Sequence, residues 1–301
     1  MNQIAQIIPY FGKWPKWIGL YLYSCGRNPM IDFIFYTDCD ITGLPIYANI
    51  RFESMTLNDY CKLVGERLNI NYKIENAYKL TDLKPFLGYI HKLELAQYKF
   101  WSFGDLDLCY GDLSMLLNER NLKRYDLLTT HCYHIAGHFT VLRNNDYYRE
   151  LCFKIGSWET RLTDNKHYGF DENEWSALVY PGLYWGRLIW KFVIRRSRVT
   201  DFILFMNLYN GIFNRKHLFH EYYTSLAPKP QQQWRYDVDN AKIFDYNGRE
   251  LPYLHFLFFK KTPWLETEDY WREGYYKLDQ PISDYAEIRI SLNGIHGIYY
   301  K

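Results

Sequence analysis

The segment FWSFGDLD, residues 100–107, places an apolar run directly before two aspartates and indicates how the chain folds around them. Its first part predicts a buried strand over residues 99–103. Because alternate residues of an extended segment point the same way, Asp105 and Asp107 are expected to project together where that strand ends. Two carboxylates this close repel each other unless protons or a cation intervene, and hard oxygen ligands suit Mg²⁺ or Mn²⁺. The small Gly104 before the pair is expected to let a ligand approach the backbone. The alternative is a turn with two solvated acids, since Asp-x-Asp is common by chance.

Strands and helices alternate along the chain on the N-terminal side of this segment. Apolar runs predict strands over residues 4–9, 32–37 and 48–52. Helical spacing predicts helices over residues 14–22, 57–68 and 80–99. This alternation predicts an α/β fold in which a mostly parallel sheet is flanked by helices. Ligands of such sheets bind beyond the carboxyl ends of the strands, so Asp38 and the aspartate pair are expected on one rim.

The alternation becomes less regular beyond residue 125. Further elements are expected as strands over 126–130, 137–142 and 253–259, a helix over 183–199 and a hairpin over 292–300. We therefore expect an irregular C-terminal extension beside the sheet.

The composition is that of a folded globular protein: of 301 residues, 48% are hydrophobic and 23% are charged, with a formal net charge of +2. Enough apolar surface is present to exclude disorder as the main state. A charge near zero gives no reason to expect a nucleic acid as a partner. Aromatic residues reach 20%, and they either build the core or stack on a nucleobase or a sugar face.

The cysteines and the N-terminus bear on the cellular compartment. No Cys-x-x-Cys pair occurs among the six cysteines, which excludes the spacing of zinc ribbons and thioredoxin-like sites. The first residues lack a basic start followed by a long apolar run, so no secretory signal is expected. No stretch of about 18 apolar residues occurs, so no membrane-spanning helix is expected. These features predict a cytoplasmic protein with reduced thiols.

Four short segments carry a resemblance to a known family. They are YKLTDLKP at 78–85, GY at 88–89, FWSFGDLD at 100–107 and GDL at 111–113. Together they resemble glycosyltransferases of the GT-A fold, and most of all an uncharacterised bacterial glycosyltransferase-like group. The resemblance implies one domain over residues 1–301. Its residues 1–145 would bind a nucleotide sugar, and its residues 146–301 would form the acceptor side.

The resemblance also implies a set of site residues. Asp105 and Asp107 would hold Mn²⁺ or Mg²⁺ and the donor diphosphate, with His255 as a further metal ligand. The donor contacts would come from Tyr10, Phe11, Asp38, Asp82, Lys84, Gly104, His138 and Lys260. Among these, Asp82 would face the ribose or the donor sugar, unless it only caps a helix. Lys84 and Lys260 would bring positive charge to the phosphates.

Two acids in the second half are candidates for a general base. Asp171 and Glu172 follow a glycine turn, and an inverting transferase needs a base for the acceptor hydroxyl. Acids at a helix start, which complement the helix dipole, are the alternative interpretation. A retaining enzyme needs no such base, so both stereochemical outcomes stay open.

Two clusters allow further interpretations. His131, His134 and His138 can be read as a zinc site, although their spacing matches no closed structural site. Four cations lie on one face of the helix expected after residue 183: Arg187, Lys191, Arg195 and Arg198. Apolar residues cover the other face. Such a helix either rests on an anionic membrane surface, peripherally and at the inner side, or packs its apolar face on the core.

The predicted reaction moves a sugar from a nucleoside diphosphate donor, with a UDP-sugar expected, to a hydroxyl of a glycan or lipid-linked acceptor. The resemblance places it in surface polysaccharide biosynthesis. One alternative is a metal-dependent phosphohydrolase, because Asp-x-Asp also opens haloacid-dehalogenase-type sites. Those sites want Thr or Val where this chain has Cys109. The other alternative is a non-catalytic sugar-binding protein on the same fold.

Overall fold

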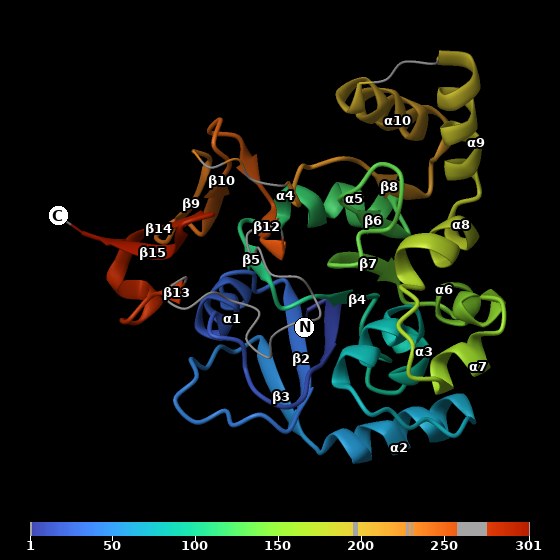
Figure 1. Ribbon diagram of the computed structural model, residues 1–301, viewed down its shortest axis with the longest axis horizontal. Helices are drawn as coiled ribbons and strands as arrows, with labels where there is room; N and C mark the ends of the chain where they lie inside the picture. Colours follow the sequence, from blue (N-terminus) through green and yellow to red (C-terminus); the bar gives the residue numbers. More distant parts are fainter. Residues whose placement is uncertain (1, 195–197, 227–228, 230, 258–275, 301) are drawn as a thin grey trace.

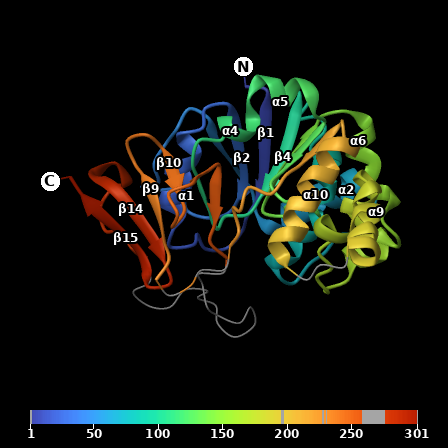
Figure 2. The ribbon, with the colours of Figure 1, turned by 90° about the horizontal axis from the view of Figure 1, so that it is seen from above.

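The computed structural model describes residues 2–194, 198–226, 229, 231–257 and 276–300 (Figure 1). A seven-stranded sheet forms the centre of the molecule. A six-stranded sheet and a pair of helices, α9 and α10, lie at opposite ends of it (Figures 1 and 2).

The seven-stranded sheet has the order β3-β2-β1-β4-β7-β6-β8. Its strands are β1 (Ile4–Pro9), β2 (Ile31–Thr37), β3 (Ile50–Ser54), β4 (Phe100–Gly104), β6 (Leu127–Thr129), β7 (Phe139–Arg143) and β8 (His217–Phe219). The run from β3 to β4 is parallel, β7 is antiparallel to both β4 and β6, and β8 is parallel to β6. The α/β architecture with a sheet that contains parallel strands is thus confirmed, as a mixed sheet. The buried apolar runs of β1 and β2 are typical of parallel strands that are covered on both faces.

Helices flank this sheet in the first half of the chain. They are α1 (Ile18–Gly26), α2 (Leu57–Leu68), the 3₁₀ helix η1 (Ala77–Phe86), α3 (Leu87–Ile90), α4 (Ser114–Leu117) and α5 (Glu119–Arg124). The prediction for 57–68 is confirmed: the Thr56 side chain accepts a hydrogen bond from the Asp59 N–H, and Asn69 ends the helix in the left-handed conformation. The single helix predicted over 80–99 is wrong. Pro85 interrupts the α-helical hydrogen bonding there, and two short helices replace it.

The middle of the chain is helical. Its elements are α6 (Asp146–Glu150), η2 (Leu151–Lys154), α7 (Trp158–Thr163), the π-helix η3 (Asp171–Trp175), α8 (Ser176–Val179), α9 (Gly182–Ile189), the π-helix η4 (Trp190–Ile194) and α10 (Val199–Phe213). The helix predicted over 183–199 is found as α9 and η4 up to Ile194, and residues 195–197 lie outside the described residues. A separate helix begins at Val199.

The C-terminal part forms a second sheet, where an irregular extension was expected. This sheet has six strands in the order β11-β10-β9-β14-β15-β13. The strands are β9 (Gln233–Asp237), β10 (Lys242–Phe244), β11 (Glu250–Leu251), β13 (Tyr276–Lys277), β14 (Tyr285–Ser291) and β15 (Gly294–Tyr299), and the 3₁₀ helix η6 (Ile282–Asp284) precedes β14. The strands pair antiparallel, except β13 with β15. The hairpin predicted over 292–300 is confirmed in its second strand, and its first strand is β14.

A short ribbon connects the two sheets in sequence and in space. It consists of β5 (Leu108–Tyr110) and β12 (Tyr253–His255), which pair antiparallel. The strand predicted over 253–259 thus ends at His255, and its last two residues lie outside the described residues. Large aromatic side chains, including Trp101, Trp175 and Trp234, are fully buried. Much of the aromatic content therefore serves the core. Among the described residues, no helix has the length and apolar character needed to cross a membrane.

Candidate active site

The two aspartates lie at the carboxyl end of β4, in the turn that leads to β5. Side-chain exposure is 30% for Asp105 and 8% for Asp107. The Asp105 N–H donates to the His138 carbonyl at 3.0 Å, which continues the pairing of β4 with β7. A Cβ at Gly104 would lie 2.9 Å from the same carbonyl and 2.7 Å from the Gln6 amide nitrogen. Glycine is therefore needed here for the close approach of protein atoms, and the residue also lines the cleft described below.

His255 reaches the aspartates because β12 pairs with β5. The register sets His255 opposite Leu108, and the Phe256 N–H donates to the Asp107 carbonyl at 3.0 Å. The Nε2 atom of His255 lies 3.4 Å from Asp107 Oδ1. On the other side of the ring, Nδ1 lies 2.9 Å from the Ser225 hydroxyl. This hydrogen bond orients the imidazole so that Nε2 faces the carboxylates.

Asp105, Asp107 and His255 form a set of potential metal ligands. One ligand atom from each lies within 4.8 Å of the others. Two carboxylates and one imidazole, with an oriented ring, fit a divalent cation of the Mg²⁺, Mn²⁺ or Zn²⁺ type. The donor set leaves coordination positions for water or a substrate oxygen, as catalytic sites do.

Lys84 lies beside this cluster and brings a positive charge to it. Its ammonium is 2.6 Å from Asp105 Oδ1 and 3.7 Å from Asp171 Oδ2. Burial alone would lower the pKa of Lys84, but the carboxylates of Asp105 and Asp171 raise it above its ordinary value. The lysine therefore stays charged in the cleft and balances part of the negative charge gathered there.

Asp171 and Glu172 begin the π-helix η3 and face the same cleft. Burial raises the pKa of Asp171, and the Lys84 ammonium opposes that shift. A Cβ at Gly137 would lie 2.5 Å from Asp171 Oδ2 and 3.1 Å from Glu172 Oε1. Asp171 and Glu172 start a helix and also line the cleft, so a role at the helix start is compatible with a role as general base.

His138 stacks on His255, with ring centroids 4.2 Å apart and an interplanar angle of 19°. Burial, and then the neighbouring His255, lower the pKa of His138 well below its ordinary value. A neutral ring is therefore packed against the potential metal ligand. His131 bonds through Nδ1 to Glu221 at 3.2 Å. Within the described part of the chain, the zinc interpretation finds no ligand set around His131 and His134.

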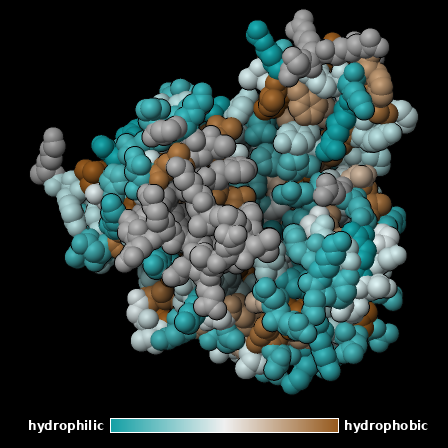
Figure 3. All heavy atoms as spheres, viewed as in Figure 1, coloured by the Kyte–Doolittle hydropathy of each residue, from teal (hydrophilic) through white to brown (hydrophobic). Residues whose placement is uncertain are grey.

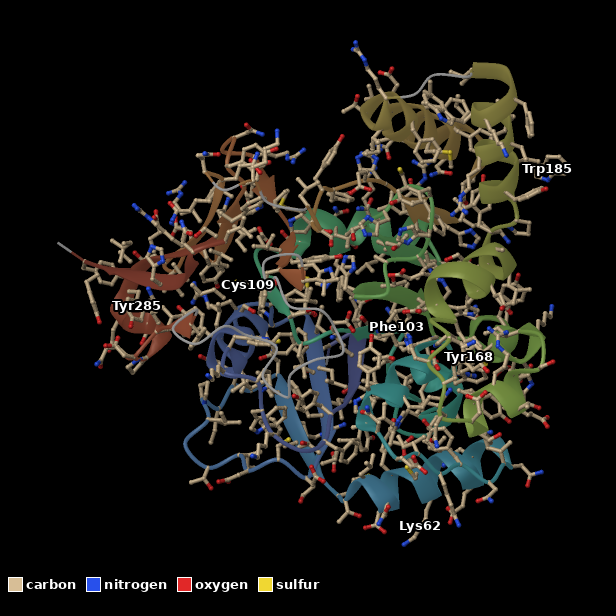
Figure 4. All side chains as sticks on the ribbon, viewed as in Figure 1. Lys62, Phe103, Cys109, Tyr168, Trp185 and Tyr285 are labelled. Carbon is tan, nitrogen blue, oxygen red and sulfur yellow. The ribbon has the colours of Figure 1, made fainter. Side chains whose placement is uncertain are left out.

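These groups line a cleft of about 690 Å³, a size typical of small-molecule sites. Its wall includes most of the residues expected at the site: Tyr10, Phe11, Lys84, Gly104, Asp105, Asp107, His138, Asp171, Glu172 and His255. The cleft lies beyond the carboxyl ends of β1 and β4, where open α/β sheets bind ligands. Figure 4 labels Phe103, which also lines the cleft, at the end of β4 near the centre of the molecule.

Two of the expected donor residues that the structure describes, Asp82 and Asp38, do not line this cleft. Asp82 is fully buried, pairs with Lys79 at 3.1 Å and accepts hydrogen bonds from the Tyr168 and Gly169 N–H groups. It lies inside η1, whose N-cap is Asn76, and its hydrogen bonds to Tyr168 and Gly169 hold the segment that leads to Asp171. Asp38 accepts a hydrogen bond from the Gly12 N–H at 2.7 Å, so it holds the loop after β1. Lys260 lies outside the described residues.

Sequence reasoning missed Ser225. This residue is thirty positions from the histidine that it orients, and a lone serine in a loop carries no local signal.

Comparisons with known proteins give a family without an assigned activity. Residues 6–264 match the family described as "Family of unknown function (DUF6625)". No curated protein matches the sequence. Among solved structures, one titled "PaToxG Glycosyltransferase" is similar over 71% of this chain and 80% of its own, with 11% identity. Its TM-score of 0.28 is too low to support an argument about fold or activity.

Proposed function

The chain belongs to the family DUF6625, and we propose that it is a metal-dependent glycosyltransferase that uses a nucleoside diphosphate sugar. One observation carries the proposal: Asp105, Asp107 and His255 bring ligand atoms within 4.8 Å of one another in a cleft beyond the carboxyl ends of parallel strands. The resemblance of residues 78–113 to GT-A glycosyltransferases supports the same reading of the aspartate pair.

The three residues would hold Mn²⁺ or Mg²⁺. When bound, such an ion neutralises the charge that grows on a departing diphosphate. Ser225 keeps the His255 ring turned toward the aspartates, and Lys84 holds Asp105 in place through its 2.6 Å ion pair. Among the described residues that line the cleft, the four acids Asp105, Asp107, Asp171 and Glu172 face two lysines, Lys13 and Lys84. This excess of carboxylates favours the binding of a cation, and of a diphosphate together with that cation.

Asp171 is the proposed general base toward the acceptor hydroxyl. Its buried carboxyl has a raised pKa, which brings its basicity closer to what proton transfer near neutral pH requires. Glu172, on the same turn, is the second candidate. Tyr10 and Phe11, at the end of β1, offer apolar surface to the nucleoside. In this assignment a UDP-sugar is the donor, and the acceptor is a glycan or a lipid-linked sugar in surface polysaccharide biosynthesis.

The test begins with nucleotide binding. Isothermal titration of the purified chain with UDP and GDP, with and without Mn²⁺, should show binding that depends on the metal. A screen for donor hydrolysis across nucleotide sugars should then identify one that turns over, and Asp107→Asn should abolish that turnover. Asp146→Asn is the matched control, because that side chain is 81% exposed and outside the cleft.

The other outcomes separate the alternatives. Release of phosphate from simple phosphate esters, without nucleotide binding, would replace the proposal with a phosphohydrolase. Metal-dependent nucleotide-sugar binding without turnover on any acceptor would replace it with a binding protein.

A further inference from the structure

The helices α9 and α10, with the π-helix η4 between them, form a feature that we call the helical arm (residues 182–213, described except for 195–197). The arm carries half of the large apolar side chains that the described residues expose. They are Tyr184, Trp185, Ile189, Phe192, Val199, Leu204, Leu208, Ile212 and Phe213. Apolar spheres gather over the arm at the upper right of Figure 3, and Trp185 points away from the body in Figure 4.

The exposure follows from the way in which α10 is anchored. Met206 and Asn210 are buried on its inner side, where the Asn210 amide donates to the carbonyls of Cys132 and Phe219 at 2.6 and 3.1 Å. The spacing of Leu204, Leu208 and Ile212 by four residues places them in one stripe. Their exposed fractions are 64%, 64% and 55%, so the stripe is unburied.

The α9 half shows the same pattern. Leu183 and Gly186 face inward, and Gly186 leaves room for the Tyr209 ring of α10. Trp185 is 60% exposed and Phe192 is 58% exposed. The expectation that the apolar face of this helix packs on the core is therefore wrong for these two side chains. Trp190 instead joins the helices by packing on Phe202 and Phe205.

The charge of the arm points to an anionic partner. Residues 182–213 contain five basic residues and one acidic residue, Asp201. Lys191 and Arg198 are exposed in the structure. Arg187 turns back to the body, where it bonds to the Tyr133 carbonyl and lies over the Tyr133 ring. Exposed aromatic and aliphatic side chains next to cations are typical of surfaces that bind in the headgroup region of an anionic bilayer.

We propose that the helical arm binds peripherally to a bilayer that contains anionic lipids. Trp185 and the stripe of Leu204, Leu208 and Ile212 enter the interface, while Lys191 and Arg198 contact headgroup phosphates. A second copy of the chain is a poorer occupant, because its arm carries the same positive charge. None of the arm residues lines the cleft, so this inference stands or falls independently of the proposed activity.

Flotation of the full chain with vesicles tests the proposal. The vesicles contain phosphatidylcholine alone or with 30% phosphatidylglycerol, an amount chosen to give a surface potential of physiological order. The chain should float with the anionic vesicles at low ionic strength and much less with the neutral ones. Lys191→Glu combined with Arg198→Glu should weaken the binding by about tenfold or more. Leu204→Ser combined with Leu208→Ser should weaken it as well.

Matched variants elsewhere keep the result specific. Lys62→Glu with Lys123→Glu makes the same charge change at exposed sites in α2 and α5, and Ile46→Ser with Leu93→Ser removes exposed apolar surface in the body. Both should float like the wild type. Bromine-labelled lipid should quench the wild-type tryptophan fluorescence more than that of Trp185→Phe.

Three results would overturn the proposal. The first is no flotation of the wild type with anionic vesicles. The second is an equal loss in the control variants. The third is a change of oligomeric state on sedimentation in the arm variants without any change in flotation, which would make the arm an interface between copies.

Discussion

The cleft buries charged side chains, whereas the helical arm exposes apolar ones. In the cleft, Lys84 and Asp171 are buried, and each is balanced by an opposite charge. In the arm, the side chains of Leu204 and Leu208 are exposed to solvent, whereas many other leucines of the molecule are buried in the core. Both arrangements lower the free energy of unfolding. Buried charges lose their hydration, and apolar side chains that stay exposed contribute no hydrophobic stabilisation.

The two regions differ in what offsets this unfavourable free energy. In the cleft, the Lys84 ammonium offsets part of the charge of Asp105 and Asp171, and the Ser225 hydroxyl is hydrogen-bonded to Nδ1 of His255. In the arm, Trp185, Leu204 and Leu208 are more than half exposed, and the proposed bilayer would bury this apolar surface. Substitutions should therefore act on activity and stability in the cleft, and on association in the arm.

The largest contrast is expected in turnover. Asp107→Asn removes one of two carboxylate ligands, and donor turnover should fall at least about a hundredfold. Lys191→Gln, in the arm, should leave turnover with a water-soluble acceptor unchanged. Steady-state assays at saturating Mn²⁺ measure both. Equal losses in the two variants would remove the distinction between the regions.

The next contrast concerns stability. Lys84→Met leaves Asp105 and Asp171 without their shared cation, and should lower the free energy of unfolding by about 3 kcal/mol. Lys191→Met alters an exposed cation and should change it by less than about 0.5 kcal/mol. Urea unfolding followed by circular dichroism measures both values. A Lys84→Met variant as stable as the wild type would show that the cleft does not depend on that ion pair.

A smaller effect is expected at Ser225, which touches only the far side of the His255 ring. Ser225→Ala frees the imidazole to rotate, so the affinity for Mn²⁺ alone should fall by about tenfold. Ser283→Ala, at an exposed site in η6, is the control. Calorimetric titration with MnCl₂ gives the two constants. Unchanged affinity in Ser225→Ala would mean that the serine does not orient a ligand.

The pH dependence of turnover should locate the base. A base must be unprotonated, so activity should fall as the pH drops through its pKa. Because burial raises the pKa of Asp171, the fall should begin at a higher pH than for a solvent-exposed aspartate. Asp171→Asn should remove this acidic limb together with most of the turnover. If the limb persists in that variant, Glu172→Gln is the substitution to examine next.

The smallest effect is expected for the apolar stripe. Leu204→Ser with Leu208→Ser should change the free energy of unfolding by less than about 1 kcal/mol, since neither side chain is buried. Leu83→Ala, at a fully buried site in η1, should cost about 2–5 kcal/mol. Thermal or urea unfolding compares the three proteins. A large loss in the double variant would mean that the stripe is part of the folded core.

The sequence predicted the features that depend on local patterns. Apolar runs located β1, β2 and β4, and the residues after β4 led to Asp105 and Asp107. Roles set by distant partners were not accessible in this way. Asp82 has the same local pattern as a ligand or a cap, and only the position of the Tyr168 and Gly169 N–H groups shows that it is a structural anchor.

The second sheet was missed for a related reason. Its strands are two to seven residues long, and although β9 alternates buried and less buried residues, such short runs do not show which strands pair into a sheet. The exposure of the apolar side chains of the arm could not be predicted from the sequence either. A 3.6-residue period predicts an apolar face but does not tell whether that face meets protein or solvent, and for α10 the answer depends on the two hydrogen bonds of Asn210.

The ribbon of β5 and β12 makes the proposed metal site depend on two segments that are far apart in the sequence. The two acids leave the ribosome long before the imidazole that completes their set, because β12 belongs to the last fifth of the polypeptide. A fragment cut before this strand would lack His255, so it would offer only two of the three side chains of the proposed metal site. If the proposal holds, such a fragment should bind Mn²⁺ more weakly than the full chain does.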